Sequence, residues 1–349
     1  MDRKLRVLHV LKSDKYSGAE NVVITVIKNM RDDIDFAYTS FDGPIRSILE
    51  ENNIMFYPAR TTSTQEIKRV INEFKPDIIH AHDYNMGIKT AIASNKIPVI
   101  SHIHNNSPWI SKYCLKSYGY YFASKKFSKI LTVSDSIVQE YVFGKKIASK
   151  TLMIGNPFDS NIVLQLSGGI ESEKKYDIGF LGRLTPQKNP MRFIRIVNEI
   201  KKFNIEPKAI IIGDGELRTN INEEIKRLKL ENNISCVGFQ KNPYKLLKQC
   251  KIMLMPSDWE GFGLAAVEGL TLGLPVVASP VGGLKNIVNE ECGKICVEDK
   301  DFCNEIVKLL SDYDYYKLKS NNALKRADEF DNIDSYINTM CKIYDNVSK

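Results

Sequence analysis

The 349-residue sequence has no apolar run of about 18 residues or more, which a helix needs to cross a bilayer. The opening stretch, MDRKLRVLHVL, contains only a short apolar segment that ends at Lys12, so no signal peptide is expected. Internal repeats and low-complexity segments are also missing. These absences argue against a membrane-spanning or secreted protein.

Cysteine is sparse: the seven residues are odd in number and scattered along the chain. This usage argues for a reducing cytosol and against a disulfide framework. The closest pair, Cys292 and Cys296, has no second pair to complete a zinc site. The net charge of +7 comes without an arginine-rich arm, so nucleic acid is not an expected partner.

The sequence does contain short apolar runs that alternate with helical patterns. In the first half, strands are expected at residues 5–11, 54–57, 78–81, 98–103 and 129–133, and helices at 19–30, 64–74, 86–95, 112–126 and 135–143. Strand–helix alternation with short connections predicts a parallel sheet covered by helices on both faces. The chain length is sufficient for two such domains.

The alternation resumes after residues 156–175, a polar segment that is interpreted as an interdomain linker. In the second half, strands are expected at residues 176–182, 209–213, 234–237, 252–255 and 275–278, and helices at 191–203 and 263–272, with a further helix that ends near residue 230. Apolar residues at helical spacing predict a last helix over 331–347.

The most informative stretch is IMLMPSDWEGFGLAAVEGLTLGLPVVA, residues 252–278. It is typical of a strand, loop, helix and strand, and its loop lies where open α/β sheets bind ligands. Glu260 and Glu268 are carboxylates in apolar or glycine-rich surroundings, although a solvated Glu260 and a surface ion pair of Glu268 are the plain alternative. The glycines that flank Phe262 would let backbone N–H groups approach a ligand.

The spacing Glu260-x7-Glu268, followed by GLPVVAS, resembles the signature of the retaining glycosyltransferases of family 4. The resemblance implies the GT-B fold, an α/β architecture of two Rossmann-like, doubly wound parallel-sheet domains that face a central cleft. It implies an acceptor-binding domain in residues 1–160, completed by a carboxyl-terminal helix in 331–349, and a nucleotide-sugar-binding domain in 161–330. Glu260 would contact the donor sugar, and Glu268 would hold the ribose.

Further segments match the same family. In Gly-Arg-Leu-x-Pro-x-Lys-Asn, which begins at Gly182, Arg183 and Lys188 are expected to bind the pyrophosphate of the donor. Gly18 follows Ser17 where the family usually has two glycines near the distal phosphate. One departure is Lys285, which stands after Gly282-Gly283-Leu284 where the family commonly has an acidic residue.

The resemblance also assigns the loop after residues 234–237 to the nucleotide base. The catalytic residues that it implies are His104, Arg183, Lys188 and Glu260. The expected donor-binding residues are Gly18, Gly182, Arg183, Lys188, Gly238, Phe239, Glu260, Gly261, Phe262, Gly263, Leu264 and Glu268.

All five histidines fall within the first 104 residues, and His80-x-His82 and His102-x-His104 each place two imidazoles on one face of a strand. The segment VISHIHNN resembles the family's strand that ends in a histidine near the donor sugar, and His104 is that residue. Polar packing at the sheet rim is the second interpretation, and a metal site of the hydrolase type is the third. The metal site ranks last because no later cluster completes it.

Departure of a nucleoside diphosphate leaves negative charge that fixed cations stabilise without a metal ion. The resemblance therefore implies a hexosyl- or N-acetylhexosaminyltransferase that uses a UDP-sugar, and the fixed cations predict that it needs no metal or other cofactor. The Asp-x-Asp matches at Asp33 and Asp312 are interpreted as chance, because neither is expected to end a strand. A sugar-nucleotide epimerase on the same fold, a metal-dependent hydrolase and a non-catalytic sugar-nucleotide binder are the alternatives.

The acceptor is expected to be a glycan or a lipid-linked sugar in bacterial surface polysaccharide synthesis, such as a capsule or exopolysaccharide. Residues 105–123 combine aromatic side chains with lysines, a composition suited to docking at a membrane surface. A core helix with a basic outer face is an equally good interpretation. The expected location is the cytoplasm, with peripheral contact at the inner face of the membrane.

Overall fold

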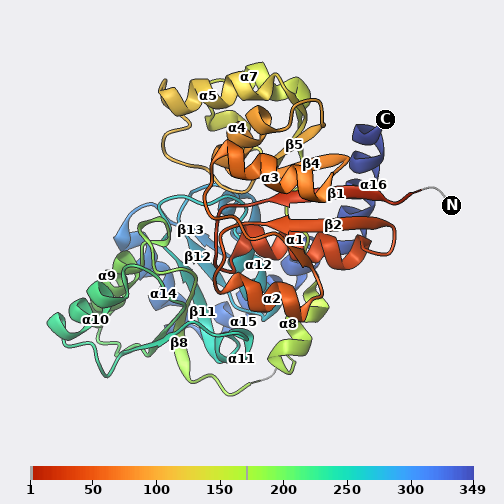
Figure 1. Ribbon diagram of the computed structural model, residues 1–349. Coiled ribbons are helices and arrows are strands. Elements are labelled where there is room, and N and C mark those ends of the chain that lie inside the picture. Colours follow the sequence, from red (N-terminus) through yellow and green to blue (C-terminus); the bar gives the residue numbers. More distant parts are fainter. Residues whose placement is uncertain (1–2, 170–171) are drawn as a thin grey trace. The chain divides into compact units, whose positions relative to one another are not determined.

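The computed structural model describes residues 3–169 and 172–349 (Figure 1). The chain divides into two compact units, Met1–Pro157 with Ile333–Lys349, and Phe158–Asn332. Part of the segment predicted as a linker is helical, because Asp159 caps a helix by accepting a hydrogen bond from the backbone of Asn161. Residues 170–171 of that prediction, and residues 1–2 of the predicted first domain, lie outside the described residues.

The first unit is built on a seven-stranded parallel sheet with the order β3-β2-β1-β4-β5-β6-β7. Its strands are β1 (Leu5–Val10), β2 (Ile34–Thr39), β3 (Met55–Phe56), β4 (Ile78–His82), β5 (Val99–Ile103), β6 (Phe127–Thr132) and β7 (Thr151–Met153). The order runs outward from β1 in both directions, which is the doubly wound arrangement. Loops that leave β1 and β4 therefore meet at one topological switch point.

Helices cover both faces of this sheet, and side chains alternate between the faces along each strand. Val7 and Leu11 pack with α1 (Gly18–Met30) and the carboxyl-terminal α16 (Ile333–Ser348), whereas Leu8 and Val10 pack with α3 (Thr64–Phe74) and α4 (Asp83–Ala93). The helices are α1 (Gly18–Met30), α2 (Ile45–Glu51), α3 (Thr64–Phe74), α4 (Asp83–Ala93), α5 (Leu115–Ser124), α6 (Ser136–Glu140), α7 (Gly144–Ile147) and α16 (Ile333–Ser348), with a 3₁₀ turn at Ala148–Lys150.

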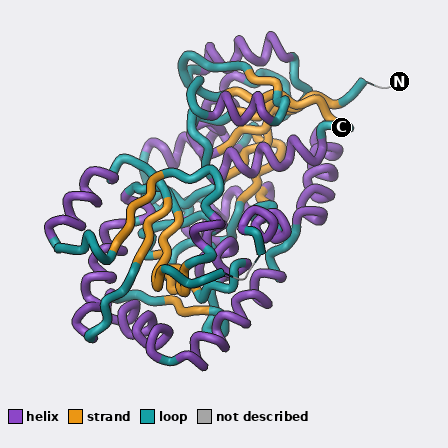
Figure 2. Tube along the Cα trace, turned by 90° about the horizontal axis from the view of Figure 1, so that it is seen from below, coloured by secondary structure: helices purple, strands orange, loops and turns teal. Residues whose placement is uncertain are grey.

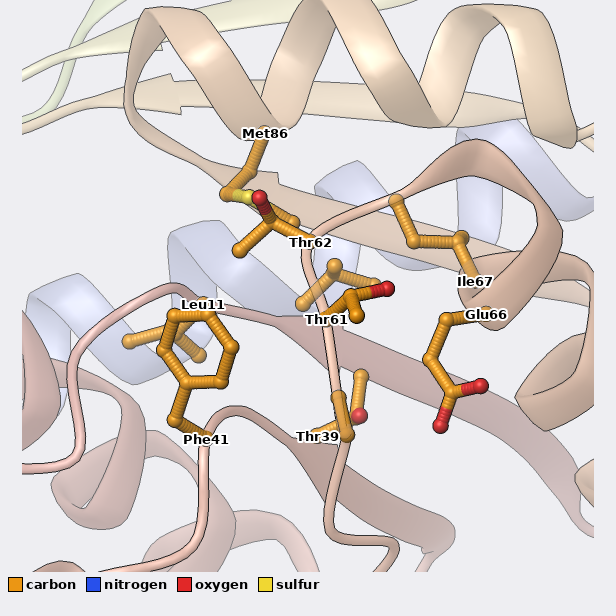
Figure 3. A pocket seen from close by; sticks show the side chains of 10 residues that line it. Leu11, Thr39, Phe41, Thr61, Thr62, Glu66, Ile67 and Met86 are labelled. Carbon is orange, nitrogen blue, oxygen red and sulfur yellow. The ribbon is translucent and has the colours of Figure 1, made fainter.

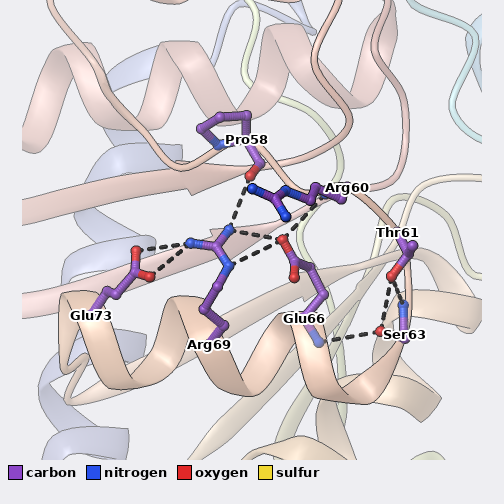
Figure 4. Close-up of polar contacts among 7 residues, drawn as sticks. All are labelled: Pro58, Arg60, Thr61, Ser63, Glu66, Arg69 and Glu73. Atoms are coloured by element: carbon purple, nitrogen blue, oxygen red, sulfur yellow. Dashed lines mark hydrogen bonds and ion pairs between the residues drawn. The ribbon is translucent and has the colours of Figure 1, made fainter.

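The loop before α3 is held in place by side chains of that helix (Figure 4). Ser63 caps the helix by accepting a hydrogen bond from the backbone N–H of Glu66. Arg69 donates to the carbonyl of Pro58 over 3.0 Å and to Glu66 over 2.8 Å. These contacts fix the rim of the sheet beside β1.

Behind this loop lies a hollow of about 10 Å³, which the side chains in Figure 3 surround. Thr39, Phe41 and Met86 are among its lining residues. The volume is close to that of a single water molecule. This hollow is therefore too small for a substrate.

The second unit contains a six-stranded parallel sheet with the order β10-β9-β8-β11-β12-β13. Its strands are β8 (Tyr176–Leu181), β9 (Ala209–Ile212), β10 (Ile234–Gly238), β11 (Cys250–Met255), β12 (Val276–Ala278) and β13 (Gly293–Ile295). The order again runs outward from the first strand of the sheet, β8. The prediction of two Rossmann-like parallel-sheet domains is confirmed.

Helices surround the strands within each unit (Figure 2). Those of the second unit are α8 (Ser160–Ser167), α9 (Pro190–Ile200), α10 (Arg218–Arg227), α11 (Tyr244–Leu247), α12 (Leu264–Thr271), α13 (Leu284–Ile287), α14 (Asp299–Ser311) and α15 (Tyr313–Asp328), with 3₁₀ turns at Pro186–Lys188 and Lys201–Phe203. Asp33 precedes β2 and Asp312 caps α15, so neither Asp-x-Asp match follows the end of a strand. In the described parts of the chain, no helix is both long enough and apolar enough to cross a membrane.

Candidate functional site

The predicted donor-binding residues of the second unit lie in loops that follow adjacent strands. Residues 182–188 follow β8, Phe239 follows β10, and residues 256–263 follow β11. Because β10, β9, β8 and β11 are parallel neighbours, their carboxyl ends lie along one edge of the sheet. The fold therefore gathers Gly182, Gly238, Gly261, Phe262, Gly263 and Leu264 at that edge.

At this edge, Lys188 and Glu260 form an ion pair. The Nζ atom of Lys188 lies 2.6 Å from Oε1 of Glu260, and the same oxygen accepts a hydrogen bond from the hydroxyl of Ser257 over 2.8 Å. The side chains are 16% and 4% exposed, respectively. A charge pair with so little exposure is held by its neighbours in one geometry, which makes it suitable for binding a substrate without large rearrangement.

Gln187 ties the two loops together. Its amide nitrogen donates to the carbonyl of Trp259 over 3.1 Å, and its amide oxygen lies 3.3 Å from Nη2 of Arg183. The backbone N–H of Asp258 donates to the carbonyl of Gln187 over 2.9 Å. Arg183 is thus coupled to the Glu260 loop through Gln187, a residue that sequence reasoning did not identify.

Two glycines after β12 allow a further backbone segment to lie against the Glu260 loop. Gly282 has a φ of +50°, and a Cβ at this position would lie 2.0 Å from the carbonyl oxygen of Glu260. A Cβ on Gly283 would lie 2.2 Å from the carbonyl oxygen of Phe262. Any other residue would displace the loop. Lys285, the departure from the family pattern, is exposed on α13.

Glu268 lies half-buried on α12 and accepts a hydrogen bond from the hydroxyl of Tyr244 over 2.9 Å. Burial raises the pKa of Glu268, whereas the hydrogen bond from Tyr244 and the charge of Lys188 act in the opposite direction. Lys188 is thus paired with Glu260 and lies close enough to Glu268 for its charge to favour the ionised carboxylate. Tyr244 contacts the site but has no signature in the sequence.

In the first unit, Gly18 begins α1 beside a hollow of about 330 Å³. The lining residues include Lys12, Asp14, Glu20 and His82. None of the described atoms, apart from those of its chain neighbours and of its own helix backbone, would lie within 4 Å of a Cβ built at Gly18. The space at this position is therefore open to a ligand, and the phosphate contact predicted for Gly18 stays a prediction.

Four of the five histidines lie on one face of the adjacent strands β1, β4 and β5, and His104 directly follows β5. His9 pairs in register with His80, and His82 pairs with His102. Neighbouring ring centroids lie 4.0 to 5.5 Å apart. The sequence pattern indicated two separate pairs and missed His9, although His9 also lies in a predicted strand.

The cluster contains two sets of three imidazoles whose ring nitrogens lie within 4.8 Å of one another, His9 with His80 and His82, and His82 with His102 and His104. Three nitrogen ligands are the number that catalytic zinc sites use. The described contacts already join two of these nitrogens, since Nδ1 of His82 lies 2.8 Å from Nε2 of His104. The expectation of a metal-free site and the sugar contact of His104 both stay predictions.

Two family models match the chain. The model described as Glycosyltransferase Family 4 matches residues 16–161, and the model described as Glycosyl transferases group 1 matches residues 168–326. Together these ranges cover most of the chain and contain every predicted site residue.

Relatives in other organisms match over most of their length. An uncharacterized glycosyltransferase of Methanocaldococcus jannaschii, MJ1059, is 28% identical, with 81% of this chain and 83% of the relative covered. The Escherichia coli UDP-Gal:alpha-D-GlcNAc-diphosphoundecaprenol alpha-1,3-galactosyltransferase is 23% identical, with 88% and 89% covered. The crystal structure of Anabaena Alr3699/HepE in complex with UDP and glucose has a TM-score of 0.83 at 22% identity and covers 98% of this chain and 100% of that one.

Proposed function

Because this chain belongs to the GT-B glycosyltransferases of the family 4 type, we propose that it moves a hexosyl or N-acetylhexosaminyl group from a UDP-sugar to a lipid-linked sugar or glycan, with retention at the anomeric carbon. The observation that carries this proposal is the buried Lys188–Glu260 pair at the edge where Arg183 and Glu268 also lie. The setting that we propose is the synthesis of a bacterial surface polysaccharide.

The choice of UDP rests on two of the similar proteins. HepE has been crystallised with UDP-glucose, and the E. coli relative is named for a UDP-galactose donor and a diphosphoundecaprenol acceptor. Arg183 offers a planar fork to the pyrophosphate and Lys188 a compact positive charge. These fixed cations stabilise the charge that develops on the leaving diphosphate, so the proposed transfer proceeds without a metal ion.

Retention is proposed to follow from attack on the same face that the diphosphate leaves. In this scheme the leaving phosphate oxygen accepts the proton of the acceptor hydroxyl as the new glycosidic bond forms and the sugar–phosphate bond breaks. Glu260 orients the donor sugar, and Glu268 holds the ribose. Tyr244 keeps the carboxylate of Glu268 in place through its hydrogen bond.

Nucleotide binding tests the donor proposal directly. We expect UDP and UDP-sugars to raise the melting temperature more than the GDP and ADP series, because a ligand at about 100 times its Kd adds about 2.7 kcal/mol to the folded state. Arg183→Ala should abolish the shift, since it removes the proposed pyrophosphate contact at an exposed position. If none of the three nucleotide series stabilises the protein, the donor proposal is wrong.

An exposed surface of the first unit, on α5, supports the proposal of a lipid-linked acceptor. Leu115, Tyr118 and Phe122 are spaced so that they share one side of the helix, and they are 92%, 42% and 58% exposed. Large apolar side chains gathered on one exposed helix face mark an interaction site. This apolar stripe lies within residues 105–123, for which the sequence left membrane docking and a core helix with a basic outer face as equally good interpretations.

Positive charge surrounds the apolar stripe. The sequence has no Asp or Glu from residue 105 to residue 134, and Lys112, Lys116, Lys125 and Lys126 are exposed there. The Nζ atom of Lys125 lies 5.2 Å from the ring centroid of Phe122. Lysines beside an exposed apolar stripe match an anionic lipid surface, on which the head groups bind the amines and the interface receives the rings.

Replacing both Leu115 and Phe122 with serine is expected to weaken partition into anionic vesicles at least about tenfold, because each side chain contributes about 1.5 to 3 kcal/mol when it is buried. Co-sedimentation with vesicles of phosphatidylglycerol and phosphatidylcholine measures this effect. The matched control is Leu318→Ser, which removes a leucine that is 57% exposed on α15 of the other unit. Equal partition of the double variant and the unmodified protein would contradict the proposal.

A further inference from the structure

Glu260 is held through only one of its two carboxylate oxygens. Nζ of Lys188 lies 2.6 Å from Oε1, and the hydroxyl of Ser257 donates to the same oxygen over 2.8 Å. Oε2 has no hydrogen-bond partner among the described residues, and it is not one of the polar atoms that are fully buried without a partner. Oε2 is therefore within reach of solvent and of a ligand at the carboxyl edge of the sheet.

The backbone of the loop after β11 (Figure 1) is held by other contacts. The N–H of Asp258 donates to the carbonyl of Gln187 over 2.9 Å, and the amide nitrogen of Gln187 donates to the carbonyl of Trp259 over 3.1 Å. Neither contact involves the hydroxyl of Ser257, whose hydrogen bond is the one to Glu260. The loop therefore keeps these two contacts when the hydroxyl is removed.

A carboxylate that is held by a single donor can still tilt. The last torsion angle of a glutamate side chain has a broad profile, so one contact leaves the plane of the carboxylate free over a wide range. The ammonium of Lys188 offers three N–H groups on a flexible stem and can follow this movement. Ser257 is 2% exposed, and its short side chain offers one O–H from a nearly fixed place. The two donors together fix the plane, whereas Lys188 alone does not.

A bound diphosphate would weaken the hold of Lys188 on this carboxylate. Lys188 is expected to contact the diphosphate of the donor, so its three N–H groups would be shared between two anions. The hydroxyl of Ser257 is neutral and buried, and it has no second anion to contact. Ser257 is therefore the contact that keeps the carboxylate of Glu260 in place while a donor is bound.

We propose that Ser257 is a positioning residue for sugar transfer, which fixes the carboxylate plane of Glu260 so that Oε2 points to the donor sugar. This inference rests on the proposed function for the identity of the ligand, and on the hydrogen bonds to Oε1 for the geometry. Ser257 acts on the substrate through Glu260. Its loss should therefore affect the rate of transfer more than the affinity for the donor.

Ser279 provides a matched control in the same unit. It is 2% exposed, like Ser257, and it directly follows β12, the strand next to β11. Its hydroxyl accepts a hydrogen bond from Nη1 of Arg192 over 3.3 Å and has no contact with Glu260. Ser279→Ala therefore removes a buried hydroxyl at the same edge of the sheet without loosening that carboxylate.

The crystal structure of the unliganded Ser257→Ala variant tests the geometry without any knowledge of the donor. We expect the carboxylate of Glu260 to adopt more than one orientation in this variant, because only Lys188 still contacts it. In Ser279→Ala we expect the orientation of the unmodified protein. If Glu260 also keeps that single orientation in Ser257→Ala, the inference is overturned.

Transfer kinetics then test the positioning role, with the UDP-sugar that raises the melting temperature most. Ser257→Ala should lower kcat about tenfold at a KM within about twofold, the effect of one misplaced hydrogen bond. Ser279→Ala should leave kcat within about twofold of the unmodified protein. A loss that appears in KM alone would contradict the positioning role of Ser257.

A second background separates positioning from a purely structural role. Once Glu260→Gln has removed the carboxylate, its orientation no longer determines the rate, so adding Ser257→Ala should lower kcat further by at most about twofold. A tenfold loss in both backgrounds would mean that Ser257 acts independently of Glu260. The positioning role would then be excluded.

The outcomes separate this inference from the proposed function. If no UDP-sugar binds, the proposed function fails, and the crystal structure of Ser257→Ala still decides whether the hydroxyl positions the carboxylate. If a UDP-sugar is transferred and Ser257→Ala and Ser279→Ala have equal kcat values, the proposed function stands and the inference is wrong.

Discussion

Acidification from about pH 7 to about pH 5 is expected to unfold the first unit while the second unit stays folded. The reason is the histidine cluster, since all five imidazoles belong to the first unit and burial lowers the pKa of each. In the unfolded chain these groups titrate near about pH 6.5. Below that pH the unfolded state binds protons that the folded state does not, so stability falls as the pH falls toward the folded-state values.

The expected size of the effect is large. A histidine that stays neutral in the folded state loses about 2 kcal/mol of stabilisation between pH 7 and pH 5. Five such groups, even if their contributions are less than additive because they touch, approach the total stability of about 5 to 15 kcal/mol for a typical domain. In the second unit, the raised pKa of Glu268 acts in the opposite direction, because the folded state binds that proton more tightly.

The two tryptophans allow each unit to be followed separately, since Trp109 lies in the first unit and Trp259 in the second. Fluorescence of Trp259→Phe then reports on the first unit alone, and Trp109→Phe reports on the second. His102→Phe should remove the contribution of one histidine to the pH dependence of the stability of the first unit. Loss of both signals at the same pH, or a first unit that stays folded at pH 5, would contradict the explanation.

Glu260→Gln is expected to lower sugar transfer about a hundredfold, because it removes one transition-state contact at constant volume. The glutamine still accepts a hydrogen bond from Ser257 through its amide oxygen. The rate of UDP release in the presence of acceptor measures the effect. Full activity in this variant would exclude the role proposed for Glu260.

Lys188→Met is expected to act differently, since it leaves the carboxylate of Glu260 buried without its cation. Breaking such a pair costs about 3 to 5 kcal/mol, so this variant should lose stability as well as transfer. Combining Lys188→Met with Glu260→Gln should recover most of the stability and none of the activity. If the double variant regained transfer, the pair would serve only the fold.

The sequence located the loops after β8 and β11 because their signals are local. Gly182 to Asn189 and Glu260 to Glu268 carry glycines and charges at fixed spacing, and each spacing corresponds to one turn between a strand and a helix. The strong apolar runs β1, β4, β5, β8, β9 and β11 were predicted for the same reason. Their burial on both faces makes them nearly continuous in hydrophobic residues.

Elements with weak local signals were missed. β13 has only three residues and exists through its pairing with β12. α15 buries only Lys319, Ala323 and Ala327, so its apolar periodicity is too slight to predict a helix. β2, which contains Asp35, was also not predicted.

Contacts between residues that are far apart in the sequence could not be predicted from local sequence patterns. Gln187 meets Trp259 across 72 positions, and Tyr244 meets Glu268 across 24 positions. The contact between His9 and His82 required the strand order, since it depends on β1 and β4 being neighbours in the sheet. Local spacing indicated the charged residues of the candidate site, whereas the neutral residues that contact them, Gln187 and Tyr244, became evident only from the tertiary packing.

The last helix has a consequence for synthesis on the ribosome. α16 covers the same sheet face as α1, and Tyr344 contacts His80, which was made 264 residues earlier. A nascent first unit must therefore keep this histidine-lined face uncovered while the whole second unit emerges. At translation rates of about 5 to 20 residues per second, that delay is on the order of ten seconds or more, during which a chaperone has access to the exposed face.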